Sequence, residues 1–245
     1  MSVNQNVAPF GGMRRAPACP KNITQRVREP VSRSKGRVVG YYASMKNKRP
    51  VAWESQLELR ACMRLEFSPS VASYQEQPAT IYFPAKNRMC RYTPDFEVKT
   101  HSGETIFIEV KPLKRINNPA IKPILCAASA FLAHKGAQYR VLTEHELIDD
   151  DLLRNLALIK PYLSQKIDEK EIKIVINWVR KQGRITLDDF VTFVGSIRKA
   201  YAFIAMGHVF VDLKAPITFD TLILPLPENH HETSLFEGRV APDFA

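Results

Sequence analysis

The sequence is poor in the features that build a disulfide framework, a zinc ribbon or a membrane anchor. Its four cysteines are scattered without a Cys-x-x-Cys pair, which argues against a disulfide scaffold and against a zinc ribbon. It has no run of about 18 apolar residues, and its N-terminus lacks the apolar stretch of a signal peptide. We therefore predict a soluble protein of the reducing cytoplasm, with no membrane partner.

Acidic residues are nearly missing from the first fifth of the chain. Residues 1–50 contain eleven Lys or Arg and one acid, Glu29, so this segment carries the equivalent of the whole net charge of +10. Its prolines and its few periodic apolar positions predict a basic, largely irregular arm over residues 1–48. Such an arm suits a polyanion, and we predict double-stranded DNA as its partner. The alternative is a solvated, mobile terminus. The predicted DNA-binding residues of this region are Arg14, Arg15, Arg26, Arg28, Arg33, Lys35, Arg37, Lys46, Lys48 and Arg49.

The remainder of the chain has an ordinary globular composition, 45% hydrophobic and 24% charged, and we divide it into two domains. The first covers residues 49–163. Its periodicity predicts a helix over 53–66, extended segments over 71–77 and 79–84, a hairpin from 95–99 and 105–111, a helix over 117–135, a strand over 138–142 and a helix from a Thr143–Glu146 capping box to residue 159. This order predicts an α/β layer domain.

The second domain covers residues 164–227 and has a different pattern. Three helical stretches precede two alternating segments, 209–213 and 217–224, which is the layout of a winged-helix-like α+β domain. The helix 197–206 would be its recognition helix, with Arg198 and Lys199 as DNA contacts. Small helical modules also dock proteins, and that alternative stays open. Residues 228–245 form an acidic tail, either a docking segment or disordered.

Charged residues with a spacing suited to chemistry lie in the predicted hairpin. A Pro-Asp pair ending at Asp95 is followed, after the turn, by Glu109-Val110-Lys111. Because side chains alternate along a strand, Glu109 and Lys111 share one face while Ile108 and Val110 share the other. Asp95 lies on the partner strand, so we expect its carboxylate to lie beside Glu109 and Lys111.

These residue types suit phosphodiester hydrolysis. Asp95 and Glu109 can supply the oxygen ligands that Mg²⁺ prefers, with Mn²⁺ as a substitute. Lys111 can orient the attacking water or stabilise the charge that develops on the phosphate. A solvated strand face would contain the same residue types, and this is the competing interpretation. The pair Pro242-Asp243 repeats only the first half of the motif, with no chain left for the second half.

A further carboxylate is expected from the helix before the sheet. Glu54 and Glu58 are four residues apart and share a helix face. We choose Glu58 as a catalytic residue and metal ligand, and treat Glu54 as a bystander. The alternative is that Ser55 and Glu58 form a capping box and that Glu58 only satisfies backbone donors.

Taken together, these motifs resemble the N-terminal nuclease domain of the TnsA family, the endonuclease subunits of heteromeric DNA transposases. The resemblance covers residues 53–163 and rests on Trp-Glu-Ser-x-Leu-Glu from Trp53, Gln-Glu-Gln-Pro from Gln75, Thr-Pro-Asp-Phe from Thr93, Glu-Val-Lys-Pro from Glu109 and the stretch 139–146. It implies a restriction-endonuclease-like core of the PD-(D/E)xK kind, whose active-site set is Glu58, Asp95, Glu109 and Lys111. Some family members have Gln at the position of Glu109.

The resemblance also implies a role. Such a subunit cuts the non-transferred strand, at the 5′ ends of a transposon, during cut-and-paste transposition in the bacterial cytoplasm, in association with the nucleoid. A DDE transposase (TnsB-like) cuts the other strand, and an AAA+ regulator (TnsC-like) links the pair to target selection. Two alternatives are a free-standing nuclease in restriction, repair or phage DNA processing, and a non-catalytic DNA-binding subunit with the same fold.

Overall fold

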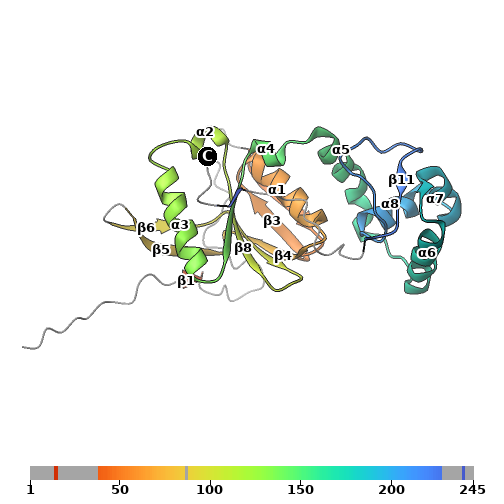
Figure 1. Cartoon of the computed structure of the whole chain (residues 1–245), viewed down its shortest axis with the longest axis horizontal. Coiled ribbons are helices and arrows are strands. Elements are labelled where there is room, and N and C mark those ends of the chain that lie inside the picture. The colour runs from red at the N-terminus through yellow and green to blue at the C-terminus, as the bar shows by residue number, and fades with distance from the viewer. Residues whose placement is uncertain (1–13, 16–37, 86–87, 228–238, 241–245) are drawn as a thin grey trace, which may run out of the picture.

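The computed structural model describes residues 14–15, 38–85, 88–227 and 239–240, which form an α/β domain and a smaller, mainly helical part (Figure 1). The α/β domain is built around a five-stranded sheet in the order β12-β9-β8-β7-β4. Its elements are β2 (Gly40–Ser44), β3 (Arg49–Trp53), α1 (Gln56–Phe67), β4 (Val71–Glu76), β5 (Ala79–Ala85), β6 (Arg88–Tyr92), β7 (Phe96–Thr100), β8 (Thr105–Val110), α2 (Leu113–Ile116), α3 (Lys122–His134) and β9 (Gln138–Leu142).

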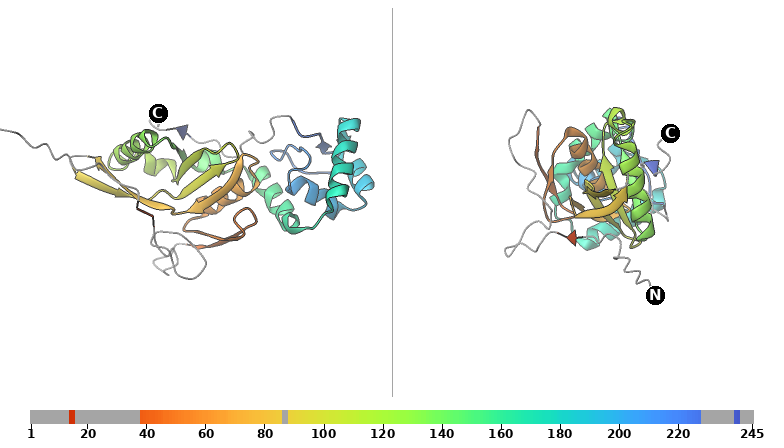
Figure 2. Two further views of the ribbon diagram at one scale, coloured as in Figure 1. Left: turned by 90° about the horizontal axis from the view of Figure 1, so that it is seen from below. Right: turned by 90° about the vertical axis from the view of Figure 1, so that its left-hand side faces the viewer.

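The central strands confirm the predicted hairpin and the alternation of its side chains. β7 pairs antiparallel with β8, with Phe96 opposite Ile108, and β8 pairs parallel with β9. Ile108 and Val110 are buried against α1, whereas Phe107 is buried on the other face with α3. The end view in Figure 2 shows these two helices on opposite sides of the sheet. Glu109 and Lys111 therefore belong to the α3 face.

Local capping explains where several helices begin. Ser55 caps α1, accepting from the Glu58 N–H, and Thr143 with Glu146 forms the predicted capping box of α4 (Glu144–Leu147). The single helix predicted from this box to residue 159 is instead two helices, α4 and α5 (Asp150–Ile159), and a 3₁₀ turn η1 (Lys160–Ser164) follows them. It is divided because Asp149 is extended and accepts from the Leu152 N–H as a second N-cap.

The basic arm ends earlier than predicted. Residues 40–53 form the β2–β3 hairpin, so the last part of the predicted irregular segment, residues 40–48, is regular structure. Gly40 permits this pairing, because a Cβ at that position would lie 2.5 Å from the ring of Trp53. Residues Arg14–Arg15 form β1, which pairs with β5. The other residues of the arm before residue 38 lie outside the described residues.

The C-terminal part contains α6 (Glu169–Gln182), β10 (Ile185–Thr186), α7 (Leu187–Val194), α8 (Ile197–Ala205) and β11 (Leu222–Ile223). β10 pairs antiparallel with β11, and Phe210 forms a bridge with Leu224. The predicted strands 209–213 and 217–224 are thus much shorter than expected. A turn interrupts the second of them, since the Thr221 N–H donates to the Thr218 carbonyl at 3.1 Å. None of the described helices has the length and hydropathy that crossing a membrane requires.

A strand from the predicted acidic tail belongs to the α/β domain. β12 (Arg239–Val240) pairs antiparallel with β9, with Arg239 opposite Val141 and Val240 opposite Arg140. The chain therefore returns from the C-terminal part to cover the edge of the central sheet. Residues 228–238 and 241–245 lie outside the described residues.

Removing the tail should expose the edge of β9. We expect a chain ending at residue 227 to lose about 1 kcal/mol of stability and to self-associate more, because an unpaired edge strand is a template for another chain. Val240→Pro is the matched variant, since it removes the backbone donor but keeps the charge of the tail. Light scattering and thermal unfolding check the result. Unchanged behaviour of both variants would show that β12 adds nothing to the domain.

Candidate active site

Asp95 is fixed by backbone contacts at the mouth of the hairpin. It directly precedes β7, and its Oδ2 accepts a hydrogen bond from the Val110 N–H at 2.7 Å. Its carbonyl oxygen accepts from the Gln77 N–H at 2.8 Å. The end of β8 and the residue that follows β4 thus hold Asp95 from both sides, and its carboxylate lies at the end of β8.

Glu109 is a buried carboxylate with two partners. Its side chain is 1% exposed, its Oε1 forms an ion pair with the Lys111 ammonium, and its Oε2 accepts a hydrogen bond from the Tyr92 hydroxyl. The Lys111 N–H donates to the Leu142 carbonyl at 3.0 Å, which extends the β8–β9 pairing by one residue. That pairing keeps Lys111 on the same face as Glu109, as the Glu-x-Lys spacing predicts.

The charge of Asp95 reaches the tyrosines beside Glu109. Burial raises the pKa of Tyr92 and of Tyr139, and the negative charge of Asp95 raises the pKa of both further. Asp95 is therefore within electrostatic reach of Tyr92, which contacts Glu109, and of Tyr139. The structure pairs Lys111 with Glu109 and holds the Asp95 carboxylate on the N–H of Val110, the residue between them.

Glu58 joins this group from the start of α1. Burial, followed by the negative charge of Asp95, raises the pKa of Glu58 to about 7. Its carboxylate also contacts the cap, accepting from the Ser55 hydroxyl at 2.9 Å and from the Glu54 N–H at 2.8 Å. Glu58 thus has the contacts of a capping residue and also lies within electrostatic reach of Asp95. Glu58 caps the helix while lying within electrostatic reach of the site.

Residues that the sequence analysis set aside or missed support this group. Glu54, treated as a bystander, accepts a hydrogen bond from the Gln77 side-chain amide at 2.9 Å. Gln77 has a positive φ of 43°, a conformation that costs a non-glycine residue energy and that its contacts with Glu54 and Asp95 help to hold. Gln77 belongs to the Gln-Glu-Gln-Pro motif of the sequence, but that motif did not indicate what the residue does.

A tyrosine pair is the other missed feature. The hydroxyls of Tyr92 and Tyr139 are 2.5 Å apart, and their rings pack edge to face with centroids 6.3 Å apart. Tyr92 ends β6, three residues before Asp95, and Tyr139 lies on β9. A tyrosine in a strand resembles any other core aromatic in sequence, so no pattern identified these two.

The carboxylates do not form a ready-made metal cage. Within the described residues, no group of three or more His, Cys, Asp or Glu side chains is arranged to hold a metal ion. The donor chemistry nevertheless fits a hard cation. Burial, and after it the negative charge of Asp95, raises the pKa of Glu58, and a divalent cation bound near carboxylates would offset both effects. Glu109 would have to exchange its contact with Lys111 for the ion.

Two of the DNA contacts predicted in the basic arm are engaged within the protein. The Lys46 ammonium donates to the carbonyls of Leu65, Ser68 and Val71 at 3.2, 2.5 and 2.7 Å. Arg49 forms a bidentate pair with the buried Glu76 at 2.9 and 2.7 Å. These contacts favour a structural role for Lys46 and Arg49 over the predicted contact with phosphate. Lys48 lies in the β2–β3 turn.

The predicted contacts of the C-terminal part lie at the start of α8. Arg198 is the second residue of the helix, whereas Lys199 pairs with Glu171 of α6 at 2.6 Å. The side chains of Arg14 and Arg15 are not described, and five further predicted contacts lie outside the described residues: Arg26, Arg28, Arg33, Lys35 and Arg37.

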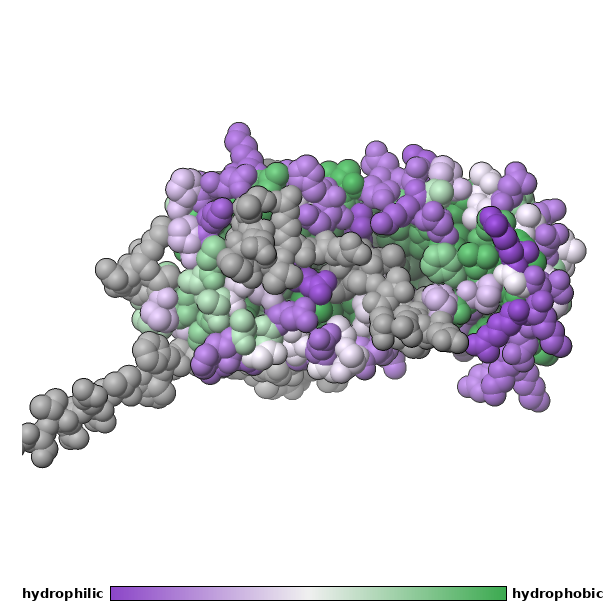
Figure 3. All heavy atoms as spheres, viewed as in Figure 1, coloured by the Kyte–Doolittle hydropathy of each residue, from purple (hydrophilic) through white to green (hydrophobic). Residues whose placement is uncertain are grey.

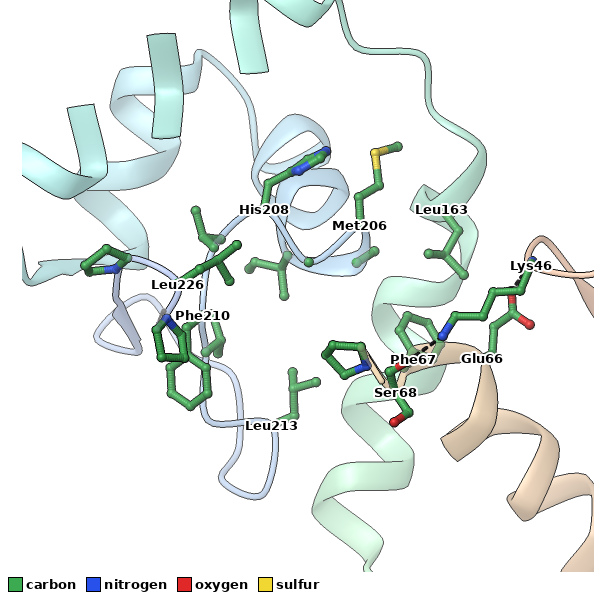
Figure 4. Close-up of a pocket in the computed structure, with 18 of the residues that line it drawn as sticks. Lys46, Glu66, Phe67, Ser68, Leu163, Met206, His208, Phe210, Leu213 and Leu226 are labelled. Carbon is green, nitrogen blue, oxygen red and sulfur yellow. Dashed lines mark hydrogen bonds between the residues drawn. The ribbon is translucent and has the colours of Figure 1, made fainter. Parts of the chain in front are cut away.

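A large cavity lies away from these carboxylates, between the two parts of the molecule. It measures about 980 Å³ and is lined by Lys46 and Glu66 from one part and by His208, Phe210 and Leu213 from the other (Figure 4). Figure 3 shows apolar surface in the C-terminal part (green, right), bordered by hydrophilic residues. None of the four predicted active-site residues lines the cavity.

Comparison with known proteins identifies a family for the first domain. Residues 68–144 match the family model described as TnsA-like endonuclease N terminal. The matched segment begins at the end of α1 and contains Asp95, Glu109 and Lys111, together with Tyr92 and Tyr139, but not Glu58. No curated protein matches the chain.

Proposed function

Because this chain carries a TnsA-like endonuclease N-terminal domain over residues 68–144, we propose that it is a magnesium-dependent DNA endonuclease. Within transposition, it would cut the non-transferred strand at the 5′ ends of a transposon. A DDE transposase would cut the other strand, and an AAA+ regulator would couple the pair to target DNA. Double-stranded DNA at the transposon ends is its proposed substrate.

The proposal rests on one observation: the buried Glu109 contacts Lys111 and Tyr92, and Asp95 accepts from the N–H of Val110, the residue between Glu109 and Lys111. A solvated strand face would leave these groups in water. Instead Glu109 is buried and contacts two polar partners, which is costly unless the arrangement serves a purpose.

The chain's own residues divide the chemistry between them. Asp95, Glu109 and Glu58 would hold the cation, which, when bound, supplies Lewis acidity towards the phosphate and lowers the pKa of water. Glu109 draws the Lys111 ammonium into the site and holds it on the face of the carboxylates. When the cation replaces Lys111 on Glu109, the Lys111 ammonium can orient the attacking water or stabilise charge on the phosphate oxygens.

Incubation with DNA tests the proposal. We expect supercoiled plasmid carrying transposon ends to be nicked in the presence of Mg²⁺ when the proposed DDE transposase partner is added. Efficient, sequence-specific cleavage by the chain alone would favour the free-standing nuclease. No cleavage under either condition, with intact transposition in cells by an Asp95→Ala variant, would favour the non-catalytic subunit.

We also infer that the basic arm and α8 contact DNA. The support for the arm is its charge, and the support for α8 is Arg198 at the helix start. The order α6-β10-α7-α8, with β11 pairing to β10 and Leu224 to Phe210, is consistent with a winged-helix-like module. A protein-docking role would use the same module without DNA.

Salt dependence measures the contribution of the arm. Deleting residues 1–37, which leaves the β2–β3 hairpin intact, should reduce the slope of log K against log salt by roughly 0.9 for each phosphate that the arm neutralises in the full chain. Fluorescence anisotropy on transposon-end DNA gives the slope. Arg198→Ala, in the full chain, tests α8 separately, with exposed Lys173→Ala of α6 as its control. An unchanged slope after the deletion would place the phosphate contacts elsewhere.

A further inference from the structure

Tyr92 connects the two chemical segments of the proposed site. It is the last residue of β6, three residues before Asp95, and its hydroxyl donates to Glu109 on β8. The strand β5, which pairs with β6, is not hydrogen-bonded to the five-stranded sheet. The Tyr92 side chain is therefore a contact between this separate ribbon and the carboxylate that a cation would need.

The direction of the hydrogen bonds follows from counting protons. An ionised carboxylate only accepts, so Tyr92 must use its single hydroxyl proton on Glu109. The hydroxyl of Tyr139 lies 2.5 Å from that of Tyr92, and it must then be the donor in their contact. The order Tyr139 to Tyr92 to Glu109 gives every hydroxyl proton an acceptor.

Packing fixes where the Tyr92 hydroxyl can lie. Its ring packs edge to face against Tyr139 and Phe83, with centroids 6.3 Å away in each case. Tyr139 and Phe83 are 2% and 1% exposed. Neither ring can move without opening the core beside α3, so the hydroxyl holds one place relative to the end of β8.

We propose that Tyr92, supported by Tyr139, is a positioning residue that orients the Glu109 carboxylate for a divalent cation. This inference rests on the proposed function. Tyr92 holds Oε2, so Oε1 is the oxygen that exchanges Lys111 for the ion. Without the tyrosine hydroxyl, both carboxylate oxygens of Glu109 can pair with the Lys111 ammonium. Neither oxygen is then free to bind the cation. Partners that hold a ligating carboxylate in this way support the affinity for the metal.

Three Tyr→Phe variants test the inference. Tyr92→Phe should raise the Mg²⁺ concentration for half-maximal cleavage, and the Kd for Mn²⁺ measured by calorimetry on the full chain, by about 10- to 100-fold. Saturating Mg²⁺ should restore most of the cleavage rate, since the reacting groups are unchanged. Tyr139→Phe should give a smaller shift in the same direction, because Tyr92 keeps its own proton for Glu109.

Tyr74→Phe is the matched control. Tyr74 is another buried tyrosine whose hydroxyl donates to a buried carboxylate, that of Glu66, at 2.8 Å, and it lies on the α1 face of the sheet. It should lower stability by a similar amount while leaving the affinity for Mn²⁺ unchanged. Equal shifts in Tyr92→Phe and Tyr74→Phe, or no shift in a folded Tyr92→Phe, would overturn the inference. If the wild-type chain binds Mn²⁺ but never cleaves DNA, the proposed function is contradicted. The inference about Tyr92 can then still be tested, because the Mn²⁺ titration compares the affinities of the tyrosine variants without cleavage.

Discussion

Asp95→Asn and Lys111→Ala are each expected to reduce DNA cleavage by roughly 10²- to 10⁴-fold while leaving the fold and DNA binding intact. Asp95 is held at the end of β8 by the Val110 N–H, and an amide oxygen can still accept that bond, so the asparagine variant removes the charge without removing the contact. Lys111 is the cation paired with Glu109. Nicking of transposon-end plasmid with the transposase partner present, beside a binding assay, measures both effects.

Lys114→Ala is the control for the lysine variant. Lys114 lies three residues further along, exposed in α2, and carries the same charge. Lys114→Ala should change the cleavage rate only by the small amount expected from removing one positive charge near the DNA. If Lys111→Ala cleaves at the rate of Lys114→Ala, Lys111 has no role in the chemistry and the active-site assignment is wrong.

Metal-free protein should become less stable as the pH rises from 5 to 8, and Glu58→Gln should remove much of that loss. The pKa of Glu58 is raised from 4.5 to about 7 in the folded state, by burial and then by Asp95. Between these values the folded state binds more protons than the unfolded state, so stability falls as the pH rises through this window. A shift of this size corresponds to on the order of 3 kcal/mol.

Denaturant unfolding at several pH values, with chelator present, tests this expectation. Glutamine stays uncharged and keeps an oxygen for the Glu54 N–H, so the variant should have a flatter profile than the wild type. Glu104→Gln is the control, because Glu104 is exposed in the β7–β8 turn. Added Mg²⁺ should stabilise the wild type more at pH 8 than at pH 5, since protons compete with the ion at low pH. A wild-type profile as flat as that of Glu58→Gln would mean that Glu58 is not buried beside Asp95.

The strands around the site could be predicted because their signals are local. The alternation from Ile106 to Val110 determines two faces, and the structure buries one against α1 and the other against α3. The Thr143 capping box likewise needs only neighbouring residues. The strands β1 and β12 lacked any such signal, because each has only two residues and pairs with a partner distant in sequence.

By itself, the sequence determined which residue types could do chemistry and which face of the hairpin would carry Glu109 and Lys111, since strand periodicity and the Glu-x-Lys spacing are properties of the chain alone. Tertiary structure alone decided what surrounds them. Packing placed Tyr92 on Glu109 and Tyr139 on Tyr92, and it brought Asp95 within electrostatic reach of Glu58. It also committed Lys46 and Arg49 to contacts within the protein. The physical reason is that burial and electrostatic proximity depend on which distant segments meet, and one chain's local pattern does not contain that information.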